Sequence, residues 1–211
     1  MGWSCTTIRR AAPGDRRTFA WIRGTAVSFR GGVGRRPRSD TASAPVDPAS
    51  DFLAVLRTHC GKALAGQIIN PQPADSAMRG HSLVMHVRGC GDTVRVPFHV
   101  GNDRSRTWVF TKTAASVRLK HDHRHEDGSE DRVTQYGGDA RAGGTAQRMA
   151  FAADSFTAAL LPASRANVWT VEVTPTRFVY QLTRTGSDRR FRVEFDLTKP
   201  VAVPPAPWGS R

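Results

Sequence analysis

Alternation of apolar and polar residues with a period of two recurs from about residue 63 onward and constrains the fold of this chain more than any other feature. It is clearest near the C-terminal end, where Phe191, Val193, Phe195 and Leu197 alternate with Arg192, Glu194 and Asp196. Successive side chains of a β-strand point to opposite faces, so this pattern indicates strands with one buried face. Turn sequences rich in glycine, asparagine and aspartate separate about ten such segments.

About ten short, one-sided strands predict an all-β fold with a mainly antiparallel sheet that has to protect its edges. An up-and-down, lipocalin-like β-barrel does so and leaves an interior for a small ligand, while a β-sandwich is the alternative. Strands and helices do not alternate, which argues against a parallel nucleotide-binding sheet. A short helix is expected before the strands, capped by Asp47 or Ser50 and ending at Cys60-Gly61.

Residues 1–45 differ in composition from the rest and are interpreted as a disordered leader or an extension from a mis-assigned start. Arg16-Arg17-Thr18-Phe19 resembles a twin-arginine export signal, and Ala42-Ser43-Ala44 resembles a cleavage site. Arg23 and Arg30 interrupt the apolar region that such a signal needs, so an organelle-type presequence stays open. The predicted organisation is a barrel domain over 46–199, a proline-rich tail over 200–211, and a periplasmic or secreted location.

The chain carries a formal net charge of +13. Nine arginines against Asp15 and Asp40 place +7 of this charge within residues 1–40, which leaves +6 for the rest, where acids and bases are interleaved. A basic nucleic-acid or anionic-surface binder is therefore an alternative, but the interleaved charges favour a solvated basic surface. No apolar run approaches the roughly 18 residues of a membrane-spanning helix.

The segment from Ser116 to Asp139 holds most of the side chains that could bind a ligand or a metal ion. By strand periodicity, His121, His123 and His125 share the face that begins with apolar Val117 and Leu119. Asp127-Gly128 predicts a two-residue type I′ hairpin loop, which would place Glu130 opposite His125 on the same inner face.

These side chains are the predicted site. The candidate ligand-binding residues in the barrel interior are His121, His123, His125, Glu130, Tyr136 and Trp108. His123, His125 and Glu130 together are a candidate set for a divalent metal, zinc or iron, because two imidazoles and a carboxylate are a known ligand combination for both. Arg132, predicted beside His123, disfavours a cation there, so hydrogen-bonded imidazoles without a metal are the alternative.

Three cysteines are present, and Cys5 lies in the N-terminal extension. A disulfide between Cys60 and Cys90 would suit an exported domain, while reduced packing cysteines are the alternative.

Two resemblances arise from these motifs. The spacing of His123, His125, Glu130 and Gly137 resembles the first metal motif of cupins, which implies a metal-dependent enzyme, although Val117 stands at the position of a cupin glycine. The segments LKHDHRHEDGSED, TQYGG, GNDRSRTW and PPAPWG are similar to those of a family of uncharacterised exported bacterial proteins. That resemblance spans from about Val46 to the C-terminus and implies export without pointing to an activity.

The sequence thus favours an exported barrel that binds a small ligand in its interior without catalysis. The alternatives are a metal-dependent cupin-like enzyme that uses His123, His125 and Glu130, and the basic surface binder.

Overall fold

A computed structural model describes residues 47–210 of the chain, and the expectations for residues 1–45 lie outside this range. Its elements, in order, are α1 (Pro48–Arg57), β1 (Ala63–Ile68), η1 (Pro73–Met78), β2 (Leu83–His86), β3 (Thr93–Val100), β4 (Asp103–Lys112), β5 (Val117–His123), β6 (Tyr136–Asp139), β7 (Arg148–Ala152), α2 (Ser155–Leu160), η2 (Pro162–Ser164), β8 (Asn167–Val173), β9 (Arg177–Arg184) and β10 (Arg190–Val201), where η1 and η2 are short 3₁₀ helices.

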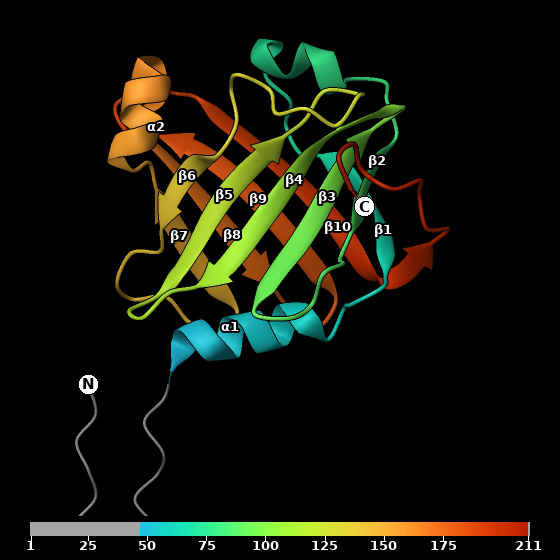
Figure 1. The fold of residues 1–211 in the computed structure, drawn as a ribbon, viewed down its shortest axis with the longest axis horizontal. Helices are drawn as coiled ribbons and strands as arrows, with labels where there is room; N and C mark the ends of the chain where they lie inside the picture. Colours follow the sequence, from blue (N-terminus) through green and yellow to red (C-terminus); the bar gives the residue numbers. More distant parts are fainter. Residues whose placement is uncertain (1–46, 211) are drawn as a thin grey trace, which may run out of the picture. The chain divides into compact units, whose positions relative to one another are not determined.

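The ten strands form one antiparallel sheet in the order β6-β5-β4-β3-β2-β1-β10-β9-β8-β7. Apart from β1 and β10, neighbouring strands in this sheet are also neighbours in the sequence, which is the up-and-down topology predicted from the alternation. The sheet curls until its two edge strands approach each other, so that it forms a nearly closed barrel (Figure 1). The predicted barrel of about ten strands with a short N-terminal helix is confirmed.

Hydrogen bonds outside regular pairing close the seam between β6 and β7. Ala140 forms a bridge with Phe151, and the amide of Asp154 donates to the carbonyl of Gly137 at 2.9 Å. The hydroxyl of Thr157 in α2 accepts from the Gly137 amide at 2.7 Å and donates to its carbonyl at 2.8 Å. Backbone groups that an open edge would expose are therefore satisfied at this seam.

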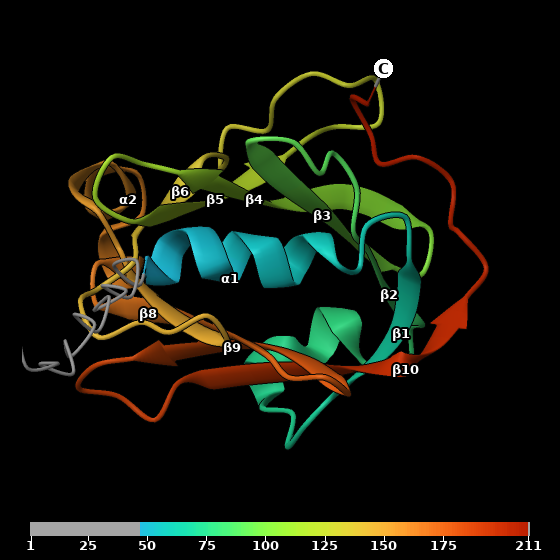
Figure 2. The same ribbon diagram turned by 90° about the horizontal axis from the view of Figure 1, so that it is seen from below.

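Helix α1 plugs one end of the barrel (Figures 1 and 2). Its first turn is capped by the Asp47 carboxylate, which accepts from the amides of Ala49 and Ser50. Phe52, Leu53 and Leu56 are each at most 1% exposed. This apolar stripe fills one end of the barrel, and the opposite end, where η1 and α2 lie, is called here the mouth (Figure 1).

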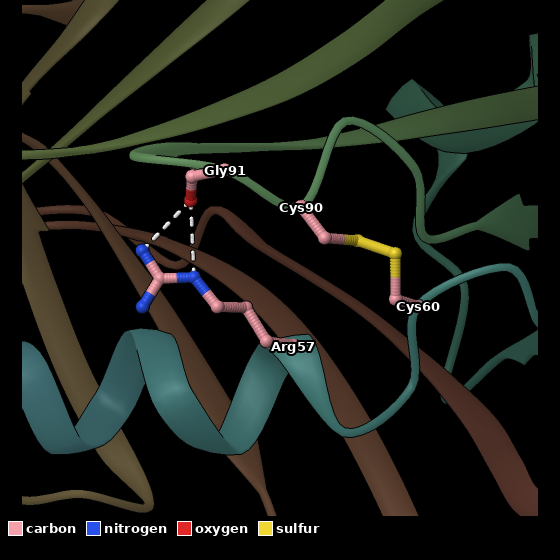
Figure 3. Close-up of a disulfide and its surroundings, with 4 residues drawn as sticks. All are labelled: Arg57, Cys60, Cys90 and Gly91. Carbon is pink, nitrogen blue, oxygen red and sulfur yellow. Dashed lines mark hydrogen bonds between the residues drawn. A yellow bond between two sulfur atoms is a disulfide. The ribbon is translucent and has the colours of Figure 1, made fainter.

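The structure joins Cys60, just after α1, to Cys90, in the turn before β3, through a disulfide (Figure 3). Beside it, the guanidinium of Arg57 donates from Nε and Nη2 to the carbonyl of Gly91 at 3.0 and 2.8 Å. These two connections attach the end of α1 to the β2–β3 turn.

The proline-rich tail continues β10 and lies against the barrel wall. The amide of Trp208 donates to the carbonyl of Arg104 at 3.1 Å, and the Arg104 guanidinium donates to the carbonyl of Ala206 at 3.0 Å. The C-terminal end of the described chain is thus fixed to β4. Within residues 47–210, no helix has the length and apolar character needed to span a membrane.

Candidate functional site

A cavity of about 290 Å³ lies inside the barrel at the mouth. Its lining comes from both halves of the sheet and from three segments around the mouth: η1 contributes Met78, the loop before β6 contributes Val133, and the α2–η2 segment contributes Leu161 and Ser164. The volume is close to the lower limit of about 300 Å³ for small-molecule sites. The cavity therefore suits a small ligand.

Its apolar side is an aromatic wall formed by Phe98, Trp108, Trp169 and Tyr180. The ring of Trp108 stacks on Tyr180 with centroids 4.3 Å apart and an interplanar angle of 13°, and on Phe98 at 4.9 Å. All four rings are at most 6% exposed. The Trp169 ring packs instead on His121 and Tyr136, with centroids 5.1 and 5.9 Å apart, so each ring of the wall is held in place by an aromatic neighbour.

His121 lies deep in the cavity, and its hydrogen bonds define its tautomer. Its Nδ1 lies 2.9 Å from the carbonyl oxygen of Tyr136, which can only accept, so Nδ1 carries the proton. Burial lowers the pKa of His121 to about 3, so the ring is neutral at pH 7 and its Nε2 accepts from the hydroxyl of Tyr180 at 2.6 Å. The strand prediction for His121 is correct: it faces inward.

His123, two residues further along β5, lies closer to the mouth. Its Nε2 is 3.1 Å from the hydroxyl of Tyr136, whose ring also stacks on His121 with centroids 4.4 Å apart. Burial, and then the positive charge of Arg106, lower the pKa of His123 to about 4. Burial raises the pKa of Tyr136 to about 12. At neutral pH these groups are uncharged hydrogen-bonding partners.

Five polar residues lie on the inner face near the mouth, four of them within β4, β5, β8 and β9 and the fifth immediately before β10. These mouth residues are Arg106, His123, Asn167, Arg184 and Arg189, and all five line the cavity. Each lies two residues from an inward apolar or aromatic residue or, for His123, from His121, so strand periodicity carries it into the barrel. The cavity therefore has an aromatic body and a polar, basic entrance.

Two of the three mouth arginines are paired with acids. Arg106 forms an ion pair with Asp103, and Nη2 of Arg189 lies 2.7 Å from a carboxylate oxygen of Asp75, whose side chain is 1% exposed. Arg184 donates instead to the neutral amide oxygen of Asn167 at 2.9 Å.

Four of the six predicted ligand-binding residues meet in this cavity: Trp108, His121, His123 and Tyr136. The other two, His125 and Glu130, are exposed, because β5 ends at His123 and the hairpin has a different loop from the one predicted. Their assignment to the barrel interior is wrong.

The hairpin loop explains this correction. The amide of Gly128 donates to the carbonyl of His125, and the amide of His125 donates to the carbonyl of Ser129, so the loop has three residues. Gly128 has φ +88°, whereas Asp127 is not left-handed as a type I′ turn requires. Glu130 therefore lies opposite Arg124 and not opposite His125 as predicted. This is a register shift of one residue, and such a shift moves a side chain to the other face of the sheet.

The predicted metal set is not assembled. Glu130 forms an ion pair with Arg124 at 3.0 Å on the outside of the barrel, and Nε2 of His123 points to the Tyr136 hydroxyl. No group of three histidine, cysteine, aspartate or glutamate side chains within residues 47–210 is arranged to hold a metal ion. His123, His125 and Glu130 thus do not fit a shared zinc or iron centre.

Arg106 and Arg184 were not among the candidates drawn from the sequence. The sequence nevertheless indicated them, because residues two apart in a strand share a face. Arg106 shares a face with Trp108 and Phe110, and Arg184 shares a face with Tyr180 and Leu182. An arginine at the end of an inward apolar series indicates the entrance of a barrel as readily as a histidine does.

Fold and site together define a small antiparallel barrel with an aromatic internal cavity and a basic mouth. Comparison of the chain with protein-family models, curated protein sequences and solved structures finds no significant match.

Proposed function

We propose that this chain is an exported barrel that binds a small molecule in its interior without catalysis. The observation that carries the proposal is the cavity at the mouth, where stacked aromatic rings adjoin neutral hydrogen-bonding groups. Apolar pockets with a few convergent polar groups are the usual form of small-molecule sites.

The chemistry of the cavity supports recognition. Trp108, Trp169 and Tyr180 contribute apolar ring surface to the cavity lining, while the Tyr136 hydroxyl and the His123 ring offer hydrogen bonds near the entrance. Because His121 and His123 are both neutral at pH 7, a ligand that covers their rings does not bury an unpaired imidazolium charge.

A periplasmic or secreted location is part of this proposal. The Cys60–Cys90 disulfide supports it, since disulfides persist mainly in oxidising compartments.

A cavity-filling variant tests the proposal. The probe is N-phenyl-1-naphthylamine, a neutral dye whose fluorescence rises in apolar surroundings, and Ser164→Trp places a large side chain at the cavity entrance. The matched control is Ala163→Trp, in the adjacent, exposed position of η2, which does not line the cavity. We expect wild type and Ala163→Trp to bind the dye alike and Ser164→Trp to bind it about tenfold more weakly.

Thermal unfolding of both variants checks that they are folded. The proposal fails if wild type does not raise the dye's fluorescence, or if Ser164→Trp binds the dye as wild type does.

A further inference from the structure

The cavity lining carries positive charge and no acid. Arg106, Arg184 and Arg189 line it, and no aspartate or glutamate of residues 47–210 does so. His121 and His123 also line it but are neutral at pH 7, because burial lowers the pKa of each. The charge at the mouth therefore comes from guanidinium groups alone.

One of these guanidinium groups lacks a charge partner. Asp103 neutralises Arg106, and Asp75 neutralises Arg189. Arg184 has no carboxylate within ion-pair distance among the described residues. Its Nε–H donates to the side-chain oxygen of Asn167, and this bond uses one of the five N–H groups of the guanidinium. The mouth thus retains one uncompensated positive charge with free donors.

The position of Arg184 relates this charge to the aromatic wall. Arg184 lies two residues beyond Leu182 and four beyond Tyr180 on the inner face of β9, which are separations of about 6.6 and 13 Å along a strand. Since Tyr180, Leu182 and Arg184 all line the cavity, a small molecule whose body lies against Leu182 and Tyr180 can direct a group at its outer end toward Arg184.

On these grounds, and resting on the proposed function, we propose that the ligand is a small monocarboxylate. Its apolar body occupies the aromatic cavity, and its carboxylate pairs with the guanidinium of Arg184 at the mouth. A planar guanidinium with free N–H groups matches a carboxylate, and a charge-assisted hydrogen bond is about twice as strong as a neutral one. Because only one guanidinium at the mouth is unpaired, a ligand with a single negative charge is enough to neutralise it.

Isosteric pairs of ligands test this inference. The probes are phenylacetate, 2-naphthoate and octanoate, each compared with its carboxamide, which has the same shape without the charge. Binding to the full-length chain is measured at pH 7 by titration calorimetry and by quenching of tryptophan fluorescence, since Trp108 and Trp169 line the cavity. We expect at least one carboxylate to bind about tenfold or more tightly than its amide.

Arg184→Met keeps an unbranched apolar stem at this position and removes the guanidinium group with its charge. We expect it to weaken carboxylate binding about tenfold or more and amide binding by less, because the amide oxygen loses a hydrogen bond but no ion pair. The control is Arg165→Met, which removes one exposed charge outside the cavity lining and is expected to alter neither affinity.

The outcomes separate the two proposals. Equal binding of carboxylates and amides, or an equal loss in Arg184→Met and Arg165→Met, overturns the carboxylate inference while the binding function stands. If neither the carboxylate nor the amide of any pair binds, both the carboxylate inference and the proposed small-molecule function are overturned.

Discussion

The hydroxyl of Tyr180 on β9 donates to Nε2 of His121 on β5 across 2.6 Å, and this hydrogen bond connects the two walls of the barrel inside its cavity. Both side chains are at most 6% exposed, so water does not replace either partner. The bond exists because the Tyr136 carbonyl holds the proton of His121 on Nδ1 and leaves Nε2 as an acceptor.

Removing this donor is expected to destabilise the barrel. Tyr180→Phe keeps the ring that stacks on Trp108 but leaves Nε2 of His121 buried without a partner. A buried polar atom without a hydrogen bond costs about 1–3 kcal/mol, so the free energy of unfolding should fall by that amount in urea denaturation. Tyr136→Phe is the control: the His123 ring is closer to the mouth, and a smaller loss is expected. Equal losses in the two variants would contradict this account of His121.

Acid is expected to destabilise the domain through its buried imidazoles. An unfolded histidine has a pKa near 6.5, whereas burial lowers the folded pKa to about 3 for His121 and to about 4 for His123. Between pH 6.5 and about 4 the unfolded chain binds protons that the folded chain excludes. Stability is therefore full above pH 6.5 and falls with pH by about 1.4 kcal/mol per unit for each such imidazole.

The slope is measured by urea denaturation between pH 7.5 and 4.5. The double variant His121→Gln/His123→Gln should show a shallower decline, with a remainder from His99, whose pKa burial also lowers to about 4. His125→Gln changes an exposed ring and should retain the wild-type slope. An unchanged slope in the double variant would mean that other groups cause the acid sensitivity.

Strand periodicity was enough to predict the barrel and the inward direction of His121 and His123. The alternation that begins at Val117 continues through β5, because each inward residue packs in the interior and a slip would expose all of them. Trp108 and Tyr136 were also predicted to face the interior, and both line the cavity.

The prediction failed where a loop decides the register. An Asp-Gly pair fits a two-residue type I′ loop and also a three-residue loop that ends in a left-handed glycine, and local sequence does not distinguish them. The structure adopts the second, which moves Glu130 beside Arg124. Pairing of Arg189 with Asp75 was equally hidden, since it joins residues more than a hundred positions apart.

The disulfide is expected to contribute a large part of the stability. Cys60 and Cys90 are 30 residues apart, and the loss of chain entropy in the unfolded state predicts about 3–4 kcal/mol for a loop of this length. Cys60→Ala/Cys90→Ala should lower the free energy of unfolding by about this amount. Arg57→Ala is the control, because it removes only exposed hydrogen bonds to Gly91 beside the disulfide, and it should cost no more than about 1 kcal/mol. Comparable losses in the two proteins would show that the disulfide itself contributes little.

Closure of the barrel depends on a glycine at the seam. A Cβ atom added at Gly138 of β6 would lie 1.9 Å from the carbonyl oxygen of Ala152 at the end of β7, and backbone on both sides leaves no flexible side chain to move. Gly138→Ala should therefore force the two strands apart and lower the free energy of unfolding by about 3 kcal/mol or more. Gly91→Ala is the matched control, since a Cβ there meets nothing within 4 Å and the backbone is not left-handed. It should leave stability unchanged or raise it by up to about 1 kcal/mol. Urea denaturation of both variants measures the difference, and wild-type stability in Gly138→Ala would show that the seam opens without cost.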